Sequence, residues 1–293
     1  MEKAKRDSLS IDRISDLPKD MLHRILYFLS QEDAVRTSVL SKSWRYIWCT
    51  RPNLDFSDIE FNGNKQDFPS TVDKTLQQYY DQGLSLEKFR LYLSLLGKDY
   101  SYHESVLLLH KWIPLLKAMG VKEFCLSILF DHNPGNTDMP SVVFKAESLE
   151  LLHLNRCNLG QNIPENIPFG RLRVLRLSNV LVENDVFERI ISSCPLLTTM
   201  SLDGCKGLKT IKLEKKIHKH LKHFIFINLM NRTSENCSIE IDIPTLETIE
   251  IMGSEIRCSM RNLSILKTLS LGSVEQSRLC IDAPNIQVCM LLT

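Results

Sequence analysis

A three-point apolar template of the form L-x-x-L-x-L recurs along most of the chain, and its spacing constrains the fold more than any other feature. The occurrences are Leu86/Phe89/Leu91, Val121/Phe124/Leu126, Leu149/Leu152/Leu154, Leu172/Leu175/Leu177, Leu197/Met200/Leu202, Leu221/Phe224/Phe226, Leu246/Ile249/Ile251, Leu266/Leu269/Leu271 and Ile286/Cys289/Leu291. Their first residues lie 35, 28, 23, 25, 24, 25, 20 and 20 positions apart. Chance matches to three apolar positions are common in a chain that is 43% hydrophobic, so the regular interval carries the argument. The later intervals, of 20 to 25 positions, are typical of solenoids built from stacked repeats, whereas the first two depart from this period.

Alternation within each template predicts a short strand, because every second side chain of a strand points to the same face. Stacking these strands in parallel would build a continuous core that no single repeat could bury. Helical patterns at residues 105–119 and 185–193 predict helices that return the chain between strands, whereas later returns are short and strand-like. We therefore expect an α+β fold, more specifically an α/β solenoid with a parallel sheet on its concave face.

Residues 10–56 follow a different pattern. Leu17-Pro18 favours a helix start, since proline is tolerated in a first turn. An apolar stripe at helical spacing follows, formed by Leu22, Ile25, Leu26 and Leu29 and broadened by Met21, Tyr27 and Phe28. Ser41 is a candidate N-cap for a later helix that carries Trp44. The pattern predicts three short helices.

This small unit has more apolar surface than it can bury by itself. One face of the first helix should pack inside the unit. The other face either meets a partner protein or packs onto the rest of the chain. Periodicity alone leaves both alternatives open.

The same residues resemble an F-box, which has a leucine-proline start and a segment like VLSKSWR at residues 39–45. The ending through Leu54-Asp55-Phe56 is similar to that of plant F-box proteins in particular. The repeats after residue 84 resemble the leucine-rich repeats that follow the F-box in many plant proteins. The chain thus resembles the plant F-box/leucine-rich-repeat family.

This resemblance implies docking onto the Skp-type adaptor of a cullin-RING (SCF) ubiquitin ligase, with the repeats binding a protein substrate for ubiquitination and degradation. The protein would be a non-catalytic substrate receptor. The residues implied in adaptor contact are Leu17, Pro18, Leu22, Ile25, Leu26, Leu29, Val39, Trp44 and Arg45. For Trp44, a place in the core of the helical unit is an equal alternative.

We expect an F-box domain at 10–56, a connector that covers the first repeat at 57–83, and eight or nine repeats at 84–293. A helical pattern at 70–81 lies within the connector. No clear polar cap and no FBD segment precede the last residue, Thr293. The chain is then either a naturally short member or the product of a truncated gene. The second case would give a scaffold or competitor that binds the adaptor without delivering a substrate, and a repeat-type sensor unrelated to ubiquitin is a third hypothesis.

Residues between the template positions should point to the concave face, where solenoids generally bind ligands. The candidates for substrate contact are Arg90, Tyr92, His153, Asn155, Arg176, Asp203, His223, Ile225, Ile227, Glu250 and Met252. This mixed set has an apolar centre at Ile225 and Ile227, which suits a protein or peptide. A nucleic acid would require a basic stripe interleaved with aromatic residues.

One lysine-rich run stands apart. It comprises Lys206, Lys209, Lys212, Lys215, Lys216, Lys219 and Lys222, with His218, His220 and His223 among them. The run is either a solvated face or an anion site centred on Lys215, Lys216 and Lys219. The histidine spacing lacks a convincing ligand set, so no metal or other cofactor is expected. No catalytic motif was found.

Compartment and partners follow from cysteine usage and charge. The nine cysteines include no C-x-x-C pair, which favours reduced thiols that pack as small core residues. No secretory signal and no stretch long enough for a membrane span are present. With a formal net charge of +1, the expectation is an intracellular protein of the cytoplasm and/or nucleus that binds neither membrane nor nucleic acid.

Overall fold

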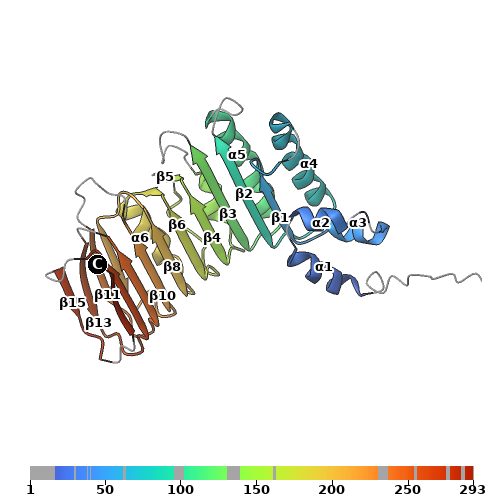
Figure 1. The fold of residues 1–293 in the computed structure, drawn as a ribbon. Helices are drawn as coiled ribbons and strands as arrows, with labels where there is room; N and C mark the ends of the chain where they lie inside the picture. The colour runs from blue at the N-terminus through green and yellow to red at the C-terminus, as the bar shows by residue number, and fades with distance from the viewer. Residues whose placement is uncertain are drawn as a thin grey trace, which may run out of the picture. The chain divides into compact units, whose positions relative to one another are not determined.

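The computed structural model describes residues 17–29, 31–37, 39, 41–61, 64–95, 102–130, 139–160, 163–229, 237–253, 256–274, 278–284 and 288–292. The chain divides into two compact units, residues 1–55 and 56–293 (Figure 1). The first is helical and the second is built on a large sheet.

The first unit contains three helices, α1 (Lys19–Tyr27), α2 (Gln31–Thr37) and α3 (Lys42–Cys49), as the pattern predicts. Its core consists of Leu22, Leu26, Ala34, Trp44 and Ile47, with Leu29 and Trp48 packed against them. The Ser41 hydroxyl accepts the Trp44 backbone N–H at 3.2 Å, which confirms the predicted N-cap of α3. The cap fixes the start of the helix that brings Trp44 into the core.

A ten-stranded sheet forms the body of the second unit, in the order β1-β2-β3-β4-β6-β8-β10-β12-β14-β16. The strands are β1 (Asn53–Ser57), β2 (Lys88–Leu95), β3 (Glu123–Phe130), β4 (Leu151–Asn155), β6 (Val174–Ser178), β8 (Thr199–Asp203), β10 (His223–Ile227), β12 (Thr248–Met252), β14 (Thr268–Gly272) and β16 (Val288–Leu292). All pairs from β2 to β16 are parallel. Every template predicted from the sequence supplies one of these strands, whereas β1 was not predicted.

The register of the sheet matches equivalent template positions from strand to strand. Phe89 is paired with Phe124, Phe124 with Leu152, and the same alignment continues to Cys289. The template side chains of β2 to β14 are buried, and the rings of Phe89 and Phe124 stack with centroids 6.1 Å apart. Each repeat therefore covers the apolar side chains of its neighbour, which confirms the predicted α/β solenoid with a parallel sheet.

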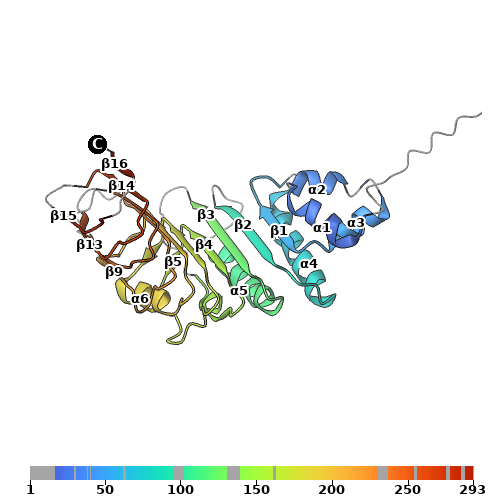
Figure 2. The same cartoon turned by 90° about the horizontal axis from the view of Figure 1, so that it is seen from below.

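The segments that return between strands change in kind along the array. In the earlier part they include α4 (Phe68–Asp81), α5 (Tyr102–Ala118) and α6 (Asn184–Ser192), with short 3-10 turns η1 (Lys65–Asp67) and η2 (Ser141–Lys145). These helices confirm the patterns at 70–81, 105–119 and 185–193 to within a few residues, and α5 and α6 lie on one side of the sheet (Figure 2). The Asp73 carboxylate fixes α4 to α5 by accepting from Lys111 and from the Trp112 indole, both at 2.5 Å.

In the later part the returns are strands, as the sequence predicts. They are β9 (Thr210–Glu214), β11 (Cys237–Asp242), β13 (Ile256–Arg261) and β15 (Leu279–Ile281), which form a second sheet in the order β15-β13-β11-β9. Two short strands, β5 (Asn158–Leu159) and β7 (Leu181–Val182), pair separately. The later repeats thus contribute strands to both sheets, and buried side chains fill the space between the two sheets.

Most of the described cysteines pack as core residues. Five of them are buried and form no disulfide, namely Cys157, Cys194, Cys205, Cys237 and Cys258. Burial raises the pKa of each of these thiols to about 12, so they stay protonated. The sequence-based interpretation of these residues as small hydrophobes is confirmed.

Candidate protein-binding surfaces

Helix α1 has two apolar faces. Leu22 and Leu26 face the core of the first unit, while the apolar side chains on the other face of the helix are exposed to solvent. Met21 and Phe28 are 54% and 76% exposed, and together with Leu17, Arg24 and Ile25 they line an apolar hollow of about 280 Å³. We call Leu17, Met21, Ile25 and Phe28 the α1 surface. Exposed apolar side chains grouped in this way are a candidate interaction site.

The structure divides the residues implied in adaptor contact into two groups. Leu17, Pro18, Ile25, Val39 and Arg45 are exposed. Leu22, Leu26 and Trp44 are buried in the core, and Leu29 is half-buried against it. The buried residues cannot touch a partner while the unit is folded, so they act by holding α1 in place. The predicted set omitted Met21 and Phe28, although the breadth of the apolar stripe was the signal for them.

The repeats present a second surface, the side of the ten-stranded sheet opposite the buried template residues. We call it the open face. The predicted substrate residues all lie there, in rows that run across the strands. One row contains Arg90, His153, Arg176, Ile225 and Glu250, the next contains Tyr92, Asn155, Asp203, Ile227 and Met252, and His223 lies in a third.

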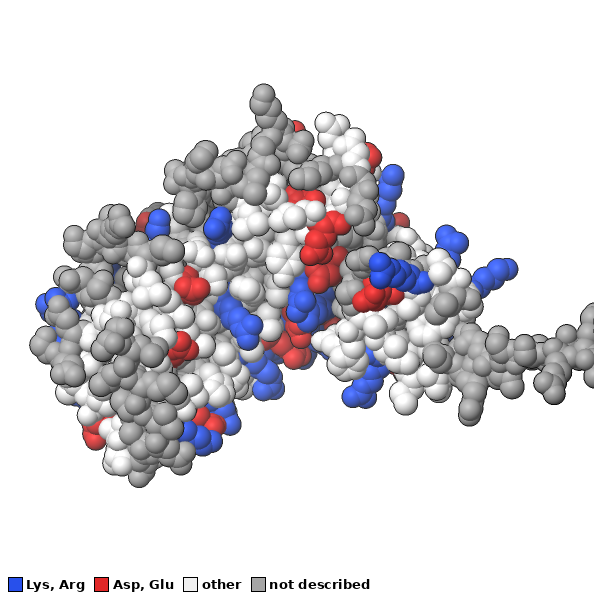
Figure 3. Space-filling model, viewed as in Figure 1, with Lys and Arg blue, Asp and Glu red and all other residues white. Residues whose placement is uncertain are grey.

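The part of the open face on β2 to β6 is basic. Arg90, Cys125, His153 and Arg176 occupy consecutive strands at the same level. Burial, followed by the positive charges of Arg176 and Arg90, lowers the pKa of His153, so its ring is neutral near pH 7. Acidic side chains accompany the basic ones on the molecular surface, as Figure 3 shows, and Lys88 pairs with Glu123 at 3.1 Å.

The part of the open face on β8 to β12 is apolar with acidic neighbours. Ile225 lies between Ser201 and Glu250, and Ile227 lies between Asp203 and Met252. These side chains are half-buried, so each offers only part of its surface to a ligand. The open face therefore consists of a basic part and an apolar-acidic part, an arrangement that suits an extended protein segment.

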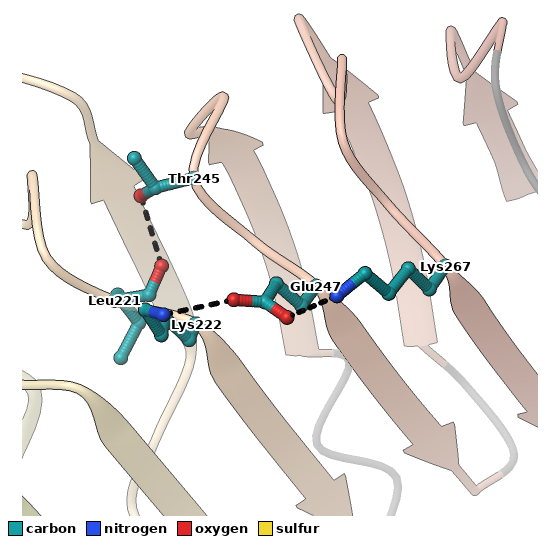
Figure 4. A network of polar contacts seen from close by, with 5 residues as sticks. All are labelled: Leu221, Lys222, Thr245, Glu247 and Lys267. Carbon is teal, nitrogen blue, oxygen red and sulfur yellow. Dashed lines mark hydrogen bonds and ion pairs between the residues drawn. The ribbon is translucent and has the colours of Figure 1, made fainter.

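The lysine-rich run does not form one patch. Lys222 pairs with Glu247 at 3.0 Å, and Lys267 holds the other carboxylate oxygen at 2.6 Å (Figure 4). Lys215 and Lys216 line a hollow on the second sheet, but Lys219 is not among its lining residues. Two of the three residues of the predicted anion patch, Lys215 and Lys216, therefore line this hollow.

The histidines of that run are also separated. His218 is buried, and its Nδ1 accepts the Glu214 backbone N–H at 3.2 Å. Burial lowers the pKa of His218. His220 is exposed and His223 lies on β10. Across the described ranges no group of three or more His, Cys, Asp or Glu side chains is placed to hold a metal ion, and no helix there is long and apolar enough to cross a membrane.

Two family models match the chain. A family model described as "F-box domain" matches residues 14–56. A second, described as "FBD-associated F-box protein At5g56370, LRR repeats", matches residues 109–290. The chain belongs to the plant F-box/leucine-rich-repeat family. The α1 surface lies within the F-box match, and the open face from β4 to β14 lies within the repeat match.

Several Arabidopsis thaliana F-box/leucine-rich-repeat proteins are similar to the chain over most of its length. The putative F-box/LRR-repeat protein At3g18150 is 27% identical over 96% of this chain and 57% of its own. F-box/LRR-repeat protein 25 is 28% identical over 85% of this chain and 89% of its own. F-box/FBD/LRR-repeat protein At2g04230 is 34% identical over 86% of this chain and 56% of its own. The chain spans about half the length of most of these curated relatives.

Proposed function

We propose that this protein is a substrate-recognition subunit of an SCF ubiquitin ligase, with its F-box bound to a Skp-type adaptor and its repeats bound to a protein substrate. The observation that carries the proposal is the α1 surface. It lies in the matched F-box, and its apolar side chains remain exposed when the three helices have packed.

An adaptor that covered Met21 and Phe28 would remove the most exposed apolar side chains of α1 from water. Burying one such side chain stabilises a complex by about 1.5–3 kcal/mol. Leu22, Leu26 and Trp44 would contribute indirectly, since they fix the rotation of α1 about its axis. Adaptor binding then depends on both groups of residues, but for different physical reasons.

The open face is the proposed substrate site. Its basic part offers Arg90 and Arg176 to an acidic group, and its apolar part offers Ile225 and Ile227 to apolar side chains. The protein would have no catalytic group of its own in this role. It would act by holding the substrate near the activated ubiquitin, which raises their effective concentration.

The proposed compartment is the cytoplasm and/or the nucleus, where such a ligase would meet its substrates. The free cysteines support this proposal, because the described thiols form no disulfide and a reducing compartment preserves that state.

A pull-down with a Skp-type adaptor tests the docking proposal. The variant Met21→Glu/Phe28→Glu should lose adaptor binding, because it places two charges in the apolar contact. The matched control is Ile59→Glu/Tyr80→Glu, which changes two exposed apolar residues outside the F-box match. Equal adaptor binding by both variants and the wild type would refute the proposal.

Substrate delivery needs a second measurement. Proteins that co-purify with the wild type should have longer cellular half-lives when the α1 surface is disrupted. Capture without any change in half-life would instead indicate a scaffold or competitor that binds the adaptor but delivers nothing.

A further inference from the structure

The second sheet carries a groove on the side facing away from the first sheet. Its volume is about 770 Å³, within the range of ligand sites in proteins. Ser238 on β11 and Ser259 on β13 lie on its floor, and long side chains such as Lys212, Arg257 and Arg261 surround them. The two short serines leave the space that the longer side chains enclose. We call this hollow the β11–β13 groove.

Strand alternation places the charged side chains in this groove. The buried side chains Ile239 and Ile241 of β11 point toward the first sheet, so Ser238, Glu240 and Asp242 point outward. The same alternation turns Arg257 and Arg261 outward on β13. The turn after β9 adds Lys215 and Lys216, and Arg278 completes the lining at the start of β15.

The groove has a marked excess of positive charge. Its charged lining residues are Lys212, Lys215, Lys216, Arg257, Arg261 and Arg278 against Glu214, Glu240 and Asp242. Six cations against three carboxylates leave an excess of three positive charges, in a chain whose formal net charge is only +1. The groove therefore concentrates positive charge on one side of the later repeats.

Two of the three carboxylates lie across from a cation in the strand register. Glu240 is paired with Lys212, and Asp242 is paired with Arg261 on one side and with Glu214 on the other. The Asn262 amide also donates to Asp242 Oδ1 at 2.7 Å. Arg257 lies across from Ser238, so this arginine and a hydroxyl are neighbours on the floor.

We propose that the β11–β13 groove binds clustered phosphate groups, carried either by a phosphorylated protein segment or by a free small polyphosphate. Arginine presents parallel N–H donors to phosphate oxygens, lysine adds a point charge, and serine hydroxyls donate from the floor. The site lies on the second sheet and needs neither the adaptor nor the open face. Its failure would leave the proposed ligase role intact.

Binding is measured by isothermal titration of the full chain with three probes. These are inorganic tripolyphosphate, a glycine-serine peptide that carries two phosphoserines, and the same peptide without phosphate. The wild type should bind at least one phosphate-bearing probe and should not bind the unphosphorylated peptide. Binding of tripolyphosphate alone assigns the site to a free polyphosphate, and binding of the phosphopeptide alone assigns it to a protein segment.

The variant Lys216→Glu/Arg257→Glu should weaken binding at least about tenfold, because it removes two charge-assisted donors and adds two negative charges. The matched control Lys209→Glu/Lys219→Glu makes the same change of charge on exposed lysines of the same run that lie outside the groove lining. It should change binding by less than about threefold, since exposed charges outside the site act through screened interactions.

A milder variant, Arg257→Gln, separates loss of binding from loss of fold. It should weaken binding while the thermal unfolding temperature stays that of the wild type. The proposal is overturned if the wild type binds neither phosphate-bearing probe, or if the groove variant and the control variant bind with equal affinity.

Discussion

The Nζ of Lys267 donates to Oε2 of Glu247 at 2.6 Å, and Lys222 holds the other oxygen of the same carboxylate at 3.0 Å (Figure 4). The three residues precede the neighbouring strands β14, β12 and β10, and backbone bonds of 2.8–2.9 Å align them. The hydrogen bond from Lys267, followed by that from Lys222, lowers the pKa of Glu247 from 4.5 to about 2. One carboxylate thus ties three successive repeats together at the start of their strands.

A carboxyl group with a lowered pKa stabilises the folded state fully above its ordinary pKa. This contribution should be lost as the pH falls from 4.5 toward 2, as Glu247 becomes protonated. We expect the Glu247 carboxyl carbon to titrate near pH 2 in NMR spectra. The variant Lys267→Met should move that midpoint upward, and so should added salt. A midpoint near 4.5 in the wild type would contradict the ion-pair geometry.

Two neighbouring residues of α1 should respond to alanine in opposite ways. Leu26 is 1% exposed, so Leu26→Ala should destabilise the first unit by about 2–5 kcal/mol through the cavity it leaves. Ile25 is 38% exposed, so Ile25→Ala should cost less than about 1 kcal/mol but weaken adaptor binding. Hydrogen exchange of the α1 amides measures the first effect and adaptor affinity the second. Faster exchange in Ile25→Ala than in Leu26→Ala would contradict the assignment of faces.

The two parts of the open face should differ in their salt dependence. Arg90→Glu/Arg176→Glu should reduce the capture of substrate proteins most strongly at low salt, because screening weakens charge contacts. Ile225→Ser/Ile227→Ser should reduce capture to a similar extent at low and high salt, because its effect is apolar. Quantitative mass spectrometry of co-purified proteins measures both. If both variants captured substrate proteins as well as the wild type does, the substrate site would have to lie elsewhere.

Two glycines with positive φ test how closely the repeats approach one another. A Cβ at Gly207 (φ 87°) would lie 2.6 Å from the Val182 carbonyl oxygen, whereas a Cβ at Gly83 (φ 62°) would meet nothing within 4 Å. Gly83→Ala should cost only the left-handed strain of about 1–2 kcal/mol. Gly207→Ala should lower the unfolding temperature further, because the backbone must also move. Similar unfolding temperatures for the two variants would contradict the close approach.

The stacked strands were predictable because every repeat carries its own copy of the apolar template. The first strand of the sheet, β1, was missed for a local reason. Leu54 and Phe56 are buried at the second and third template positions, but Arg51 stands at the first. Arg51 is buried there with its guanidinium 5.4 Å from the centre of the Trp48 ring. Because a charged residue occupies the first template position, a search for three apolar residues does not detect this repeat.

The surfaces were only partly predictable because side-chain exposure depends on packing between distant segments. On α1 the apolar stripe was visible, but only the packing of α3 shows that Leu26 faces inward and Phe28 outward. The β11–β13 groove could not be derived from the lysine run, because Arg257 and Arg261 come from another repeat. Lys219 follows the end of β9 and is not among the residues that line the groove, although it is only three positions from Lys216 in the sequence.

The change from helical to strand-like returns has a consequence for the curvature of the array. A packed helix occupies about 8–10 Å, whereas neighbouring strands lie about 4.7–4.9 Å apart. A helical return such as α5 or α6 therefore favours wider spacing at the rear of the array than at the front. The returning strands β9 to β15 favour equal spacing at front and rear. We therefore expect a ligand that spans the open face to meet a more curved sheet beside Arg90 and Arg176 than beside Ile225.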